Sequence, residues 1–483
     1  MDTRRTRWLA GALIGVALPG LAGVGGAAAD TPKSSTGPST STSPYLVPSA
    51  PGVSVTSVLT VGDAVGNKPD GTPYRMVGIP DGLGAFDNGD GTFTVLMNHE
   101  LGADKGITRA HGAAGAFVSK WIIRKKDLKV LKGEDLIRTL VLQSGTNTLS
   151  RLCSADLPAS SAFYNRRSGK GYPGRIFMNG EETGTEGRAF AHLMDGTSYE
   201  LPHLGKASFE NQLANPATGD RTVVIGTDDT TPGQLYVYVG TKKSTGSPVD
   251  KAGLTGGTLF GVKVSGGPLE QSAAPFAKGT AFSLHPFGDV SSWTGATLQS
   301  ASVEAGVTEF LRPEDGAWDP KHPNDFYVNT TDKFDGHSRL WRLRFADVSN
   351  PAAGGTIEAL LDGTEGQQML DNMTMTRNGK LILQEDPGNQ PYLARVWQYS
   401  VKGDRLTQVA AHDPARFAAG APGLLTTDEE SSGVLDVSSI LGKGAFLLTT
   451  QAHYAITREA ISGELVEGGQ LQVMRVHSEH DDD

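Results

Sequence analysis

The sequence contains a single cysteine, Cys153, among its 483 residues, so it can form no internal disulfide bond. A lone thiol is a liability outside the cytoplasm unless it is buried or binds a metal ion. Cys153 therefore has two interpretations, a small buried apolar side chain or a metal ligand. Both stay open at this point.

The motifs of several common enzyme classes are also absent. The chain has no GxSxG sequence, no Walker motif, no HExxH and no paired CxxC, which argues against common serine-hydrolase, nucleotide and zinc chemistries. Positive charge is in deficit, because 43 Lys and Arg face 53 Asp and Glu. An acidic protein repels nucleic acid and anionic membranes and suits multivalent cations. We therefore expect neither nucleic acid nor a membrane as a partner.

Long apolar runs are lacking except at the N-terminus, over residues 9–26. This run follows a basic segment and precedes the small residues Ala27–Ala29, a pattern typical of a secretory signal peptide over residues 1–29. Gly and Pro interrupt the run, which disfavours a spanning helix. The adjacent Arg4 and Arg5 permit twin-arginine export, with the general route as the alternative. Without three arginines and one aspartate of this leader, the secreted chain has a net charge of −12 rather than −10.

The rest of the chain predicts one large domain with two short flanking segments. Ser, Thr and Pro dominate residues 30–52, which predicts a disordered linker. Residues 53–476 have the texture of short strands and tight turns, with many of the 62 glycines. Residues 477–483 form a charged tail. A domain of roughly 400 residues is the size of a propeller or barrel, and we expect a monomer.

Six separate apolar runs each end on a cluster of acids, amides or histidine. A run of about four to eight β-branched, Leu or aromatic residues bounded by Gly, Asn and Asp predicts a buried strand. Strands that deliver carboxylates at their C-terminal ends predict an all-β fold, a six-bladed β-propeller with long loop insertions and acids around its axis. The runs are Thr94–Glu100, Arg175–Glu182, Thr222–Asp229, Asp325–Asp332, Lys380–Asp386 and Ala445–His453.

The acids at these strand ends predict calcium sites. Adjacent carboxylates repel each other unless a cation neutralises them. Neighbouring side chains on a strand point to opposite faces, but a bend at the strand end can bring both to one cation. Solvated turn carboxylates explain any single pair, whereas their recurrence favours metal. The candidate ligands are Glu100, Glu181, Glu182, Asp228, Asp229, Glu385 and Asp386, with amide oxygens of Asn98, Asn179, Asn329, Asn372 and Gln384 nearby.

Basic side chains accompany these acids. Arg312 precedes Pro313 and Glu314, and the proline restricts how its neighbours project. An arginine beside metal-binding carboxylates can clamp a phosphate or carboxylate group through two parallel hydrogen bonds, and a structural salt bridge is the alternative. His99 and His453 lie in the terminal clusters of the first and last runs. They are interpreted either as contacts to ligand residues or substrate, or as ordinary structural histidines.

Two local predictions complete the chain. Residues 111–132 are the best helix candidate, although residues 121–126 also fit an edge strand. Residues 87–94 predict a hairpin, because Asn-Gly and Asp-Gly are strong turn signals. The same stretch lacks the flanking helices and terminal glutamate of an EF-hand loop.

Together these residues resemble the PhoX-type alkaline phosphatases over most of the secreted chain. The resemblance implies a six-bladed propeller with a buried iron and calcium cluster that hydrolyses phosphate esters. The chain departs from the family at Phe209, where histidine is usual, and at Ala159, where tryptophan is usual. The motifs that carry the resemblance are Asn98-His99-Glu100, Cys153, Gly180-Glu181-Glu182, Ser208-Phe209-Glu210, Thr227-Asp228-Asp229, Arg312-Pro313-Glu314, Asp371-Asn372 and Gln384-Glu385-Asp386.

The same resemblance implies residue roles. Cys153, Glu210 and Glu314 would hold Fe³⁺, and the catalytic Arg312 and Glu314 would act on the substrate phosphate. The Ca²⁺ ligands would come from the strand-end acids given above. Ferric iron accepts carboxylates, and a thiolate tunes it. The expected partner is a small phosphate monoester, with diesters left open.

Two other functions fit parts of this pattern. A calcium-dependent six-bladed lactonase or related hydrolase would use one Glu, two Asn and one Asp around a single cation, but it leaves Cys153 and Arg312 without roles. A non-catalytic propeller would bind a partner through its rim, with calcium as a structural ion. The fold does not decide among the three, because propellers host all of them.

Overall fold

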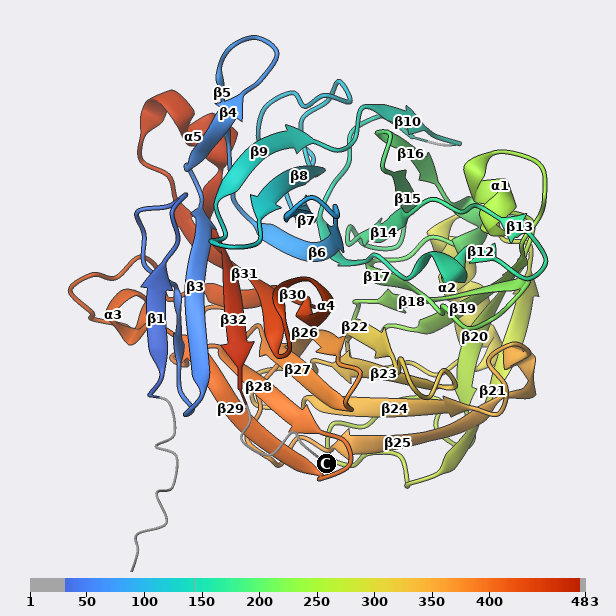
Figure 1. Cartoon of the computed structure of the whole chain (residues 1–483). Helices are drawn as coiled ribbons and strands as arrows, with labels where there is room; N and C mark the ends of the chain where they lie inside the picture. The colour runs from blue at the N-terminus through green and yellow to red at the C-terminus, as the bar shows by residue number, and fades with distance from the viewer. Residues whose placement is uncertain (1–30, 144, 478–483) are drawn as a thin grey trace, which may run out of the picture.

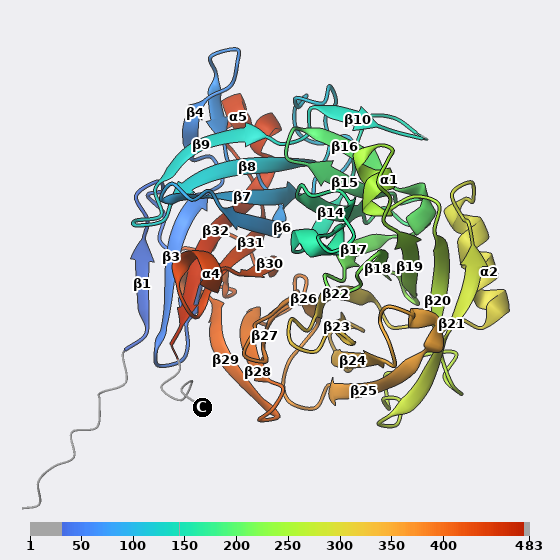
Figure 2. The ribbon, with the colours of Figure 1, turned by 45° about the vertical axis from the view of Figure 1, so that its right-hand side comes forward.

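The computed structural model describes residues 31–143 and 145–477, and its secondary structure is mostly β. Figures 1 and 2 show the sheets arranged around a common centre, a propeller-like arrangement. The expected signal peptide and residues 478–483 of the expected tail lie outside the described residues. No helix within the described ranges is long and apolar enough to cross a membrane.

Two sheets come from the first part of the chain. Their strand orders are β6-β7-β8-β9 and β10-β16-β15-β14-β11, and two short hairpins, β4-β5 and β12-β13, accompany them. The bounds are β4 Ala64–Asn67, β5 Pro73–Arg75, β6 Pro80–Asp87, β7 Thr92–His99, β8 Phe117–Arg124, β9 Val130–Asp135, β10 Thr139–Val141, β11 Leu152–Asp156, β12 Tyr164–Asn165, β13 Lys170–Gly171, β14 Ile176–Glu181, β15 Ala189–Leu193 and β16 Thr197–Glu200.

The middle of the chain forms one sheet of nine strands, in the order β17-β18-β19-β20-β21-β25-β24-β23-β22. Its two halves run outward from β17 and from β22, and they join where β21 pairs with β25 at the outer edge. The bounds are β17 Phe209–Ala214, β18 Arg221–Asp228, β19 Leu235–Thr241, β20 Thr258–Val264, β21 Thr280–Gly288, β22 Pro313–Trp318, β23 Asp325–Thr330, β24 Arg339–Phe345 and β25 Gly355–Leu361.

Both ends of the chain contribute to the last two sheets, which have the orders β2-β29-β28-β27-β26 and β1-β3-β32-β31-β30. Antiparallel pairing of β3 with β32 joins the N-terminal and C-terminal parts of the domain. The bounds are β1 Lys33–Thr36, β2 Leu46–Pro48, β3 Val53–Thr60, β26 Leu370–Met375, β27 Lys380–Glu385, β28 Arg395–Ser400, β29 Arg405–His412, β30 Glu429–Asp436, β31 Ala445–Ala455 and β32 Glu467–Val476.

Helices are short and lie on the connections between strands. The longest among the described residues, α2 (Gly295–Ala305), begins at a Thr294 cap and ends at Gly306 in a left-handed conformation. The others are α1 Pro248–Ala252, α3 Pro414–Phe417, α4 Ser438–Leu441, α5 Glu459–Leu465 and the 3₁₀ turns Ser160–Ala162, Pro202–Leu204 and Pro351–Ala353.

The predicted linker is wrong for its described part, residues 31–52. β1 pairs with β3, β2 pairs with β29, and Tyr45 and Leu46 are buried. The backbone N–H of Tyr45 donates to the side chain of Gln470 at 2.7 Å. This polar segment forms strands because the edges of two sheets supply hydrogen-bond partners that the segment lacks on its own.

The predicted helix over residues 111–132 is also wrong, and the edge-strand alternative is closer. Phe117–Arg124 is strand β8, which pairs with β7 on one side and β9 on the other. Its buried residues alternate along the second half of the strand, which suits β-branched and aromatic side chains. The hairpin over residues 87–94 is confirmed by the pairing of Asp87 with Phe93.

The six predicted apolar strands are confirmed, and each is the second strand outward in its sheet. They are continuous apolar runs because both faces are covered by neighbouring sheets. In β18, Val223 and Ile225 pack in one core cluster, whereas Val224 packs in another with Ile176. The strands are β7, β14, β18, β23, β27 and β31.

The innermost strands form a closed ring within the described part of the chain. β6 contacts β11, β11 contacts β17, β17 contacts β22, β22 contacts β26, β26 contacts β30, and β30 contacts β6 again. Figures 1 and 2 label β6, β17, β22, β26 and β30 around the centre. Side chains that project from one end of the ring therefore converge.

Candidate metal centre

Three overlapping groups of candidate metal ligands meet at one end of this ring, within the residues that the structure describes. In each group the ligand atoms lie within 4.8 Å of one another. Cys153 belongs to two groups and Glu210 to two, so the three groups form one continuous cluster. They are Asp81-Glu100-Cys153, Cys153-Glu182-Glu210 and Glu210-Glu314-Asp371.

Most of these ligands occupy the same position in successive innermost strands, namely the second residue. In five strands the pairing register shifts across this residue, so the side chain projects from a β-bulge. A bulge re-aims a side chain out of the regular alternation. The positions are Asp81 in β6, Cys153 in β11, Glu210 in β17, Glu314 in β22, Asp371 in β26 and, without a bulge at that point, Glu430 in β30.

A second set of acids comes directly after the second strand outward. Antiparallel pairing places the end of that strand beside the start of the innermost strand, as Leu152 with Glu181 and Phe209 with Asp228 show. The acid that follows each strand therefore lies at the same end as the first set. These acids are Glu100 after β7, Glu182 after β14, Asp229 after β18 and Asp386 after β27.

The backbone is strained immediately before four of the innermost strands. Ile79, Arg151, Arg312 and Met369 have φ of 50°, 46°, 61° and 41°, and each is followed two residues later by a member of the cluster. A left-handed conformation at a residue with a Cβ costs about 1–2 kcal/mol. Such strain clusters at functional sites, because the surrounding structure must hold it in place.

Burial and mutual repulsion raise the pKa of the clustered groups. The pKa values of Asp81, Cys153, Glu210, Glu314 and Asp371 rise well above their ordinary values, first through burial and then through neighbouring acids. Burial and repulsion therefore favour the protonated forms of these groups when no cation is bound. A buried cluster of carboxylates is therefore a site that cations would fill.

The donor set suits metal ions. The thiol of Cys153 lies 3.1 Å from Oε2 of Glu182, so a soft ligand stands beside hard oxygen ligands. Oδ1 of Asp81 is buried and has no hydrogen-bond partner among the described residues. A buried oxygen of this kind is costly unless a ligand satisfies it. The cluster offers more oxygen donors than a single cation requires.

Two arginines contact the cluster. Arg312 donates from Nε and Nη2 to Asp229 at 2.9 and 2.8 Å, and Nη2 lies 2.9 Å from Glu314. The charge of Glu314 raises the pKa of Arg312 further above its ordinary value. Arg151, which the sequence analysis did not select, lies 2.8 Å from Glu100 and also pairs with Glu182.

The structure places three of the predicted calcium ligands outside the three ligand groups. Glu181 accepts two hydrogen bonds of 2.7 Å from Arg188. Asp228 accepts from the backbone N–H of Ser208 at 3.1 Å. Both oxygens of Glu385 accept hydrogen bonds, from the backbone N–H groups of residues 368 and 395 and from the side chains of residues 392 and 397. Strand alternation turns each of them away from its neighbour in the pair.

The remaining predicted acids lie at the cluster. Glu100, Glu182, Glu210 and Glu314 belong to the ligand groups with Cys153. Asp229 uses both oxygens for Arg312. Burial raises the pKa of Asp386, and Arg312 and His453 act in the opposite direction.

The two predicted histidines have different surroundings. His453 lies 2.6 Å from Glu467 and 3.8 Å from Glu430, and although burial lowers the pKa of His453, these acids raise it to about 11. His99 is buried, lies between the carbonyl of Gly78 and the hydroxyl of Ser119, and burial lowers its pKa to about 3. His99 is therefore a structural histidine, whereas His453 is a cation beside the acids.

Several of the predicted amides donate hydrogen bonds to the backbone of residues in the cluster. Asn98 donates to the carbonyl of Cys153 at 2.6 Å, and Asn179 donates to Asn98 at 2.9 Å. Asn329 donates to the carbonyl of Asp371 at 2.9 Å. These amides hold the backbone of ligand residues in place. Of the remaining two amides, Asn372 donates to Ser154, and Gln384 is buried at the end of β27.

Sequence reasoning missed Asp81, Glu430 and Arg151 as site residues, and it used Asp371 only as part of a motif. They lie on or before innermost strands, which contain few apolar residues, so no hydrophobic period marks them. The signal that could have found them is a short spacing to the following apolar strand that recurs along the chain. Asp81 precedes β7, for example, as Glu210 precedes β18.

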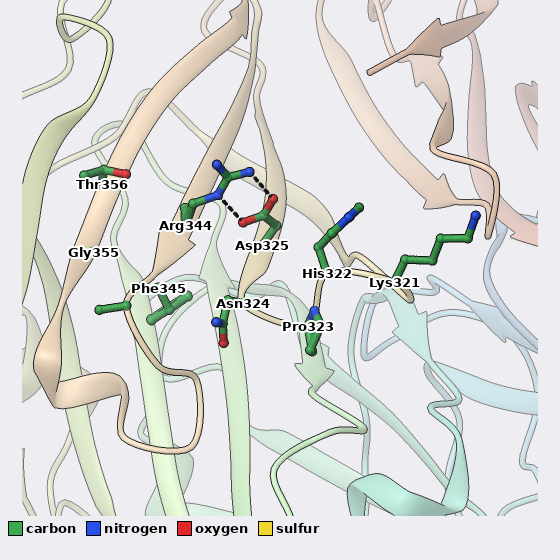
Figure 3. A pocket seen from close by; sticks show the side chains of 10 residues that line it. Lys321, His322, Pro323, Asn324, Asp325, Arg344, Phe345, Gly355 and Thr356 are labelled. Carbon is green, nitrogen blue, oxygen red and sulfur yellow. Dashed lines mark hydrogen bonds and ion pairs between the residues drawn. The ribbon is translucent and has the colours of Figure 1, made fainter. Parts of the chain in front are cut away.

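A separate cavity of about 750 Å³ lies at the opposite end of β23 (Figure 3). Figure 3 shows Arg344 paired with Asp325, and this ion pair has two hydrogen bonds of 2.7 and 2.6 Å. Both charges are therefore neutralised within the protein. Among the described residues, none of the three groups of candidate metal ligands includes a residue that lines this cavity.

Comparisons with known proteins found similar solved structures at low sequence identity. No family model matches the chain, and no curated protein matches it. A solved structure of Pseudomonas fluorescens PhoX in complex with vanadate, a transition state analogue, is similar with a TM-score of 0.60 and 12% identity, over 89% of this chain and 96% of that chain. A protein of unknown function from Dyadobacter fermentans has a TM-score of 0.41 and 9% identity, over 89% and 100%. The chain shares the fold of the PhoX structure.

Proposed function

We propose that this protein is a secreted, metal-dependent phosphatase of the PhoX type that hydrolyses phosphate esters at an iron and calcium cluster on a six-bladed β-propeller. The observation that carries the proposal is the continuous cluster of one thiol and six acids, with Arg312 beside it. The ring of six innermost strands supports six blades, with the nine-stranded sheet counted as two. The fold similarity to a vanadate-bound phosphatase supports the same conclusion.

Fe³⁺ would be held by Cys153, Glu210 and Glu314. Ca²⁺ would be held by the surrounding acids. When bound, these ions supply positive charge that offsets the charge developing on the phosphate and make a nucleophile available at neutral pH. The proposed calcium ligands are Asp81, Glu100, Glu182, Asp371, Asp386 and Glu430.

The chain's own residues would bind and orient the ester. Arg312 would donate hydrogen bonds to phosphate oxygens, and Asp229 would hold its guanidinium in one orientation. Pro313 and the strained backbone at Arg312 fix where this side chain begins. Burial of the acids lowers the local dielectric constant, which strengthens each electrostatic contact.

The location, oligomeric state and partners of the protein are proposed from the sequence. We propose that the acidic chain acts outside the cell as a monomer on small phosphate esters, without nucleic acid or membrane partners. A lactonase or a binding propeller with one calcium ion would use only part of this cluster and would leave Cys153 without a role.

The proposal is tested on the wild-type protein. Purified protein should contain iron and calcium by elemental analysis and should hydrolyse p-nitrophenyl phosphate, and chelation should remove both the metals and the activity. If protein incubated with both metals takes up no iron and leaves the ester intact, the proposal is wrong.

A further inference from the structure

We propose that Arg151 forms the second half of the phosphate site, opposite Arg312, and selects phosphate monoesters over diesters. This inference rests on the proposed phosphatase function. It concerns a residue for which neither the motifs nor the comparisons provide a role.

Arg151 and Arg312 occupy equivalent places in the fold. Each residue directly precedes an innermost strand, β11 or β22, and each has a left-handed backbone conformation. Each stands two residues before a proposed iron ligand, Cys153 or Glu314. Isoleucine and methionine stand at the equivalent places before β6 and β26, so arginine is particular to these two positions.

The two side chains also make equivalent contacts. Arg151 uses its Nε and Nη2 for Glu182, and Nη2 also reaches Glu100 at 2.8 Å. Arg312 uses its Nε and Nη2 for Asp229, and Nη2 also reaches Glu314. In both arginines Nη1 donates to no described residue. Each guanidinium therefore keeps one side available to a ligand.

The three proposed iron ligands lie between these arginines. Glu182, the partner of Arg151, belongs to one ligand group with Cys153 and Glu210. Glu314, the partner of Arg312, belongs to another group with Glu210. Glu182 also interacts electrostatically with Asp229 and Glu314, the two partners of Arg312. A chain of neighbouring acids therefore connects the two guanidinium groups, and the proposal places the phosphate across this chain.

Arg151 and Arg312 are both partly exposed, unlike an arginine that lies wholly within the core. The side chain of Arg151 is 47% exposed, and that of Arg312 is 28% exposed. By contrast, Arg339 is fully buried against Glu270 and donates to two carbonyls. A half-exposed arginine that reaches into a buried acidic cluster is placed to meet a ligand from solvent.

The charge of the substrate explains the proposed selectivity. A phosphate monoester dianion has three free oxygens and two negative charges, which two guanidinium groups match. A diester has one negative charge and two free oxygens, which one bidentate arginine already satisfies. Arg151 therefore adds to monoester binding and little to diester binding.

The test compares Arg151→Gln, Arg312→Gln and the control Arg166→Gln, in which an exposed arginine between β12 and β13 loses the same charge. Iron and calcium are measured in each protein. kcat/KM is measured for p-nitrophenyl phosphate and bis(p-nitrophenyl) phosphate, and calorimetry measures the binding of inorganic phosphate.

We expect Arg151→Gln to lower kcat/KM for the monoester and phosphate affinity by ~10–100-fold, the loss of a charge-assisted contact, with diester hydrolysis and metal content retained. Arg312→Gln should lower both hydrolyses, and Arg166→Gln neither. Equal losses on both esters, no loss, or depleted metal in Arg151→Gln would overturn the inference.

The failure of the phosphatase proposal can be recognised separately. If the metal-loaded wild type hydrolyses neither ester, that proposal is wrong, and phosphate calorimetry then decides the role of Arg151. Weaker phosphate binding in Arg151→Gln than in Arg166→Gln would support the inference, and equal binding would overturn it. Arg151→Gly provides a second variant, because it removes the side chain without backbone strain.

Discussion

Adjacent acids in this chain have opposite surroundings. The second member of each pair lies at the central cluster, whereas the first member is held by hydrogen bonds within its own sheet. A shift of one residue along a strand turns a side chain to the other face, and this is enough to separate the two roles. The pairs are Glu181–Glu182, Asp228–Asp229 and Glu385–Asp386. The acids at the central cluster are therefore candidate cation ligands. The first members of the pairs, which we call the sheet acids, instead stabilise their own sheets.

The largest effect is expected at the centre itself, in Cys153→Ser. If the thiolate binds iron, this variant should lose iron and any visible absorption that depends on it, and phosphatase activity should fall by more than ~100-fold. Serine is nearly isosteric, so a buried packing cysteine would tolerate the exchange without a change in metal content. Iron and calcium per chain are measured beside phosphomonoester hydrolysis. Unchanged iron with full activity would remove Cys153 from the ligand set.

The comparison within a pair is tested by Glu182→Gln against Glu181→Gln. Glu182→Gln should lower metal content and activity without loss of stability in the metal-free protein, because it removes a repelling charge. Glu181→Gln should destabilise the protein by about 3–5 kcal/mol, because it leaves the charge of Arg188 buried without its partner. Denaturant midpoints and metal content are measured for both variants. The same loss of metal in both variants would contradict the distinction between acids at the central cluster and acids hydrogen-bonded within their own sheets.

The sequence predicted the strands of this fold better than it predicted the site. β7 and β18 are buried on both faces, so their apolar runs are long and visible. The innermost strands lie along the axis and carry polar and small residues, and only their repetition in space identifies them. The pairing of β3 with β32 spans almost the whole domain, so no local pattern could predict it.

The type of site could be predicted from the sequence, but the identity of all its residues could not. The recurrence of acids at strand ends indicated metal, and it located Glu100 and Glu182. It could not separate the members of a pair, because the choice depends on a partner such as Arg188 that only the fold brings near. The bulges that aim Asp81 and Asp371 toward the centre follow from strand pairing, which a single sequence does not display.

The metal-free protein should show a distinctive pH dependence. Burial and neighbouring acids raise the pKa of Glu182 to about 7 and that of Glu430 to about 8, from 4.5. The folded state therefore retains protons that the unfolded state releases between these values, so the free energy of unfolding falls as pH rises from about 5 to 8. We expect a loss of a few kcal/mol over this range.

Denaturant midpoints at pH 5 and pH 8 with chelator present would measure this loss. Added iron and calcium should restore stability at pH 8, because cations neutralise the ionised acids and bind only the folded state. A metal-free protein equally stable at both values would mean that Arg151, Arg312 and His453 already compensate the cluster.

The smallest effect is expected in the pair Asp228–Asp229, of which Asp229 contacts Arg312. Asp229→Asn keeps one acceptor oxygen where Arg312 now has two, so the guanidinium should lose its fixed orientation. KM for a phosphomonoester should rise by ~10-fold, with kcat less affected and metal content unchanged. Asp228→Asn keeps an acceptor for the backbone N–H of Ser208 and should leave both constants nearly unchanged. A loss of iron or calcium in Asp229→Asn would instead make Asp229 a metal ligand, as its position after β18 first indicated, and Arg312 would then be held mainly by Glu314.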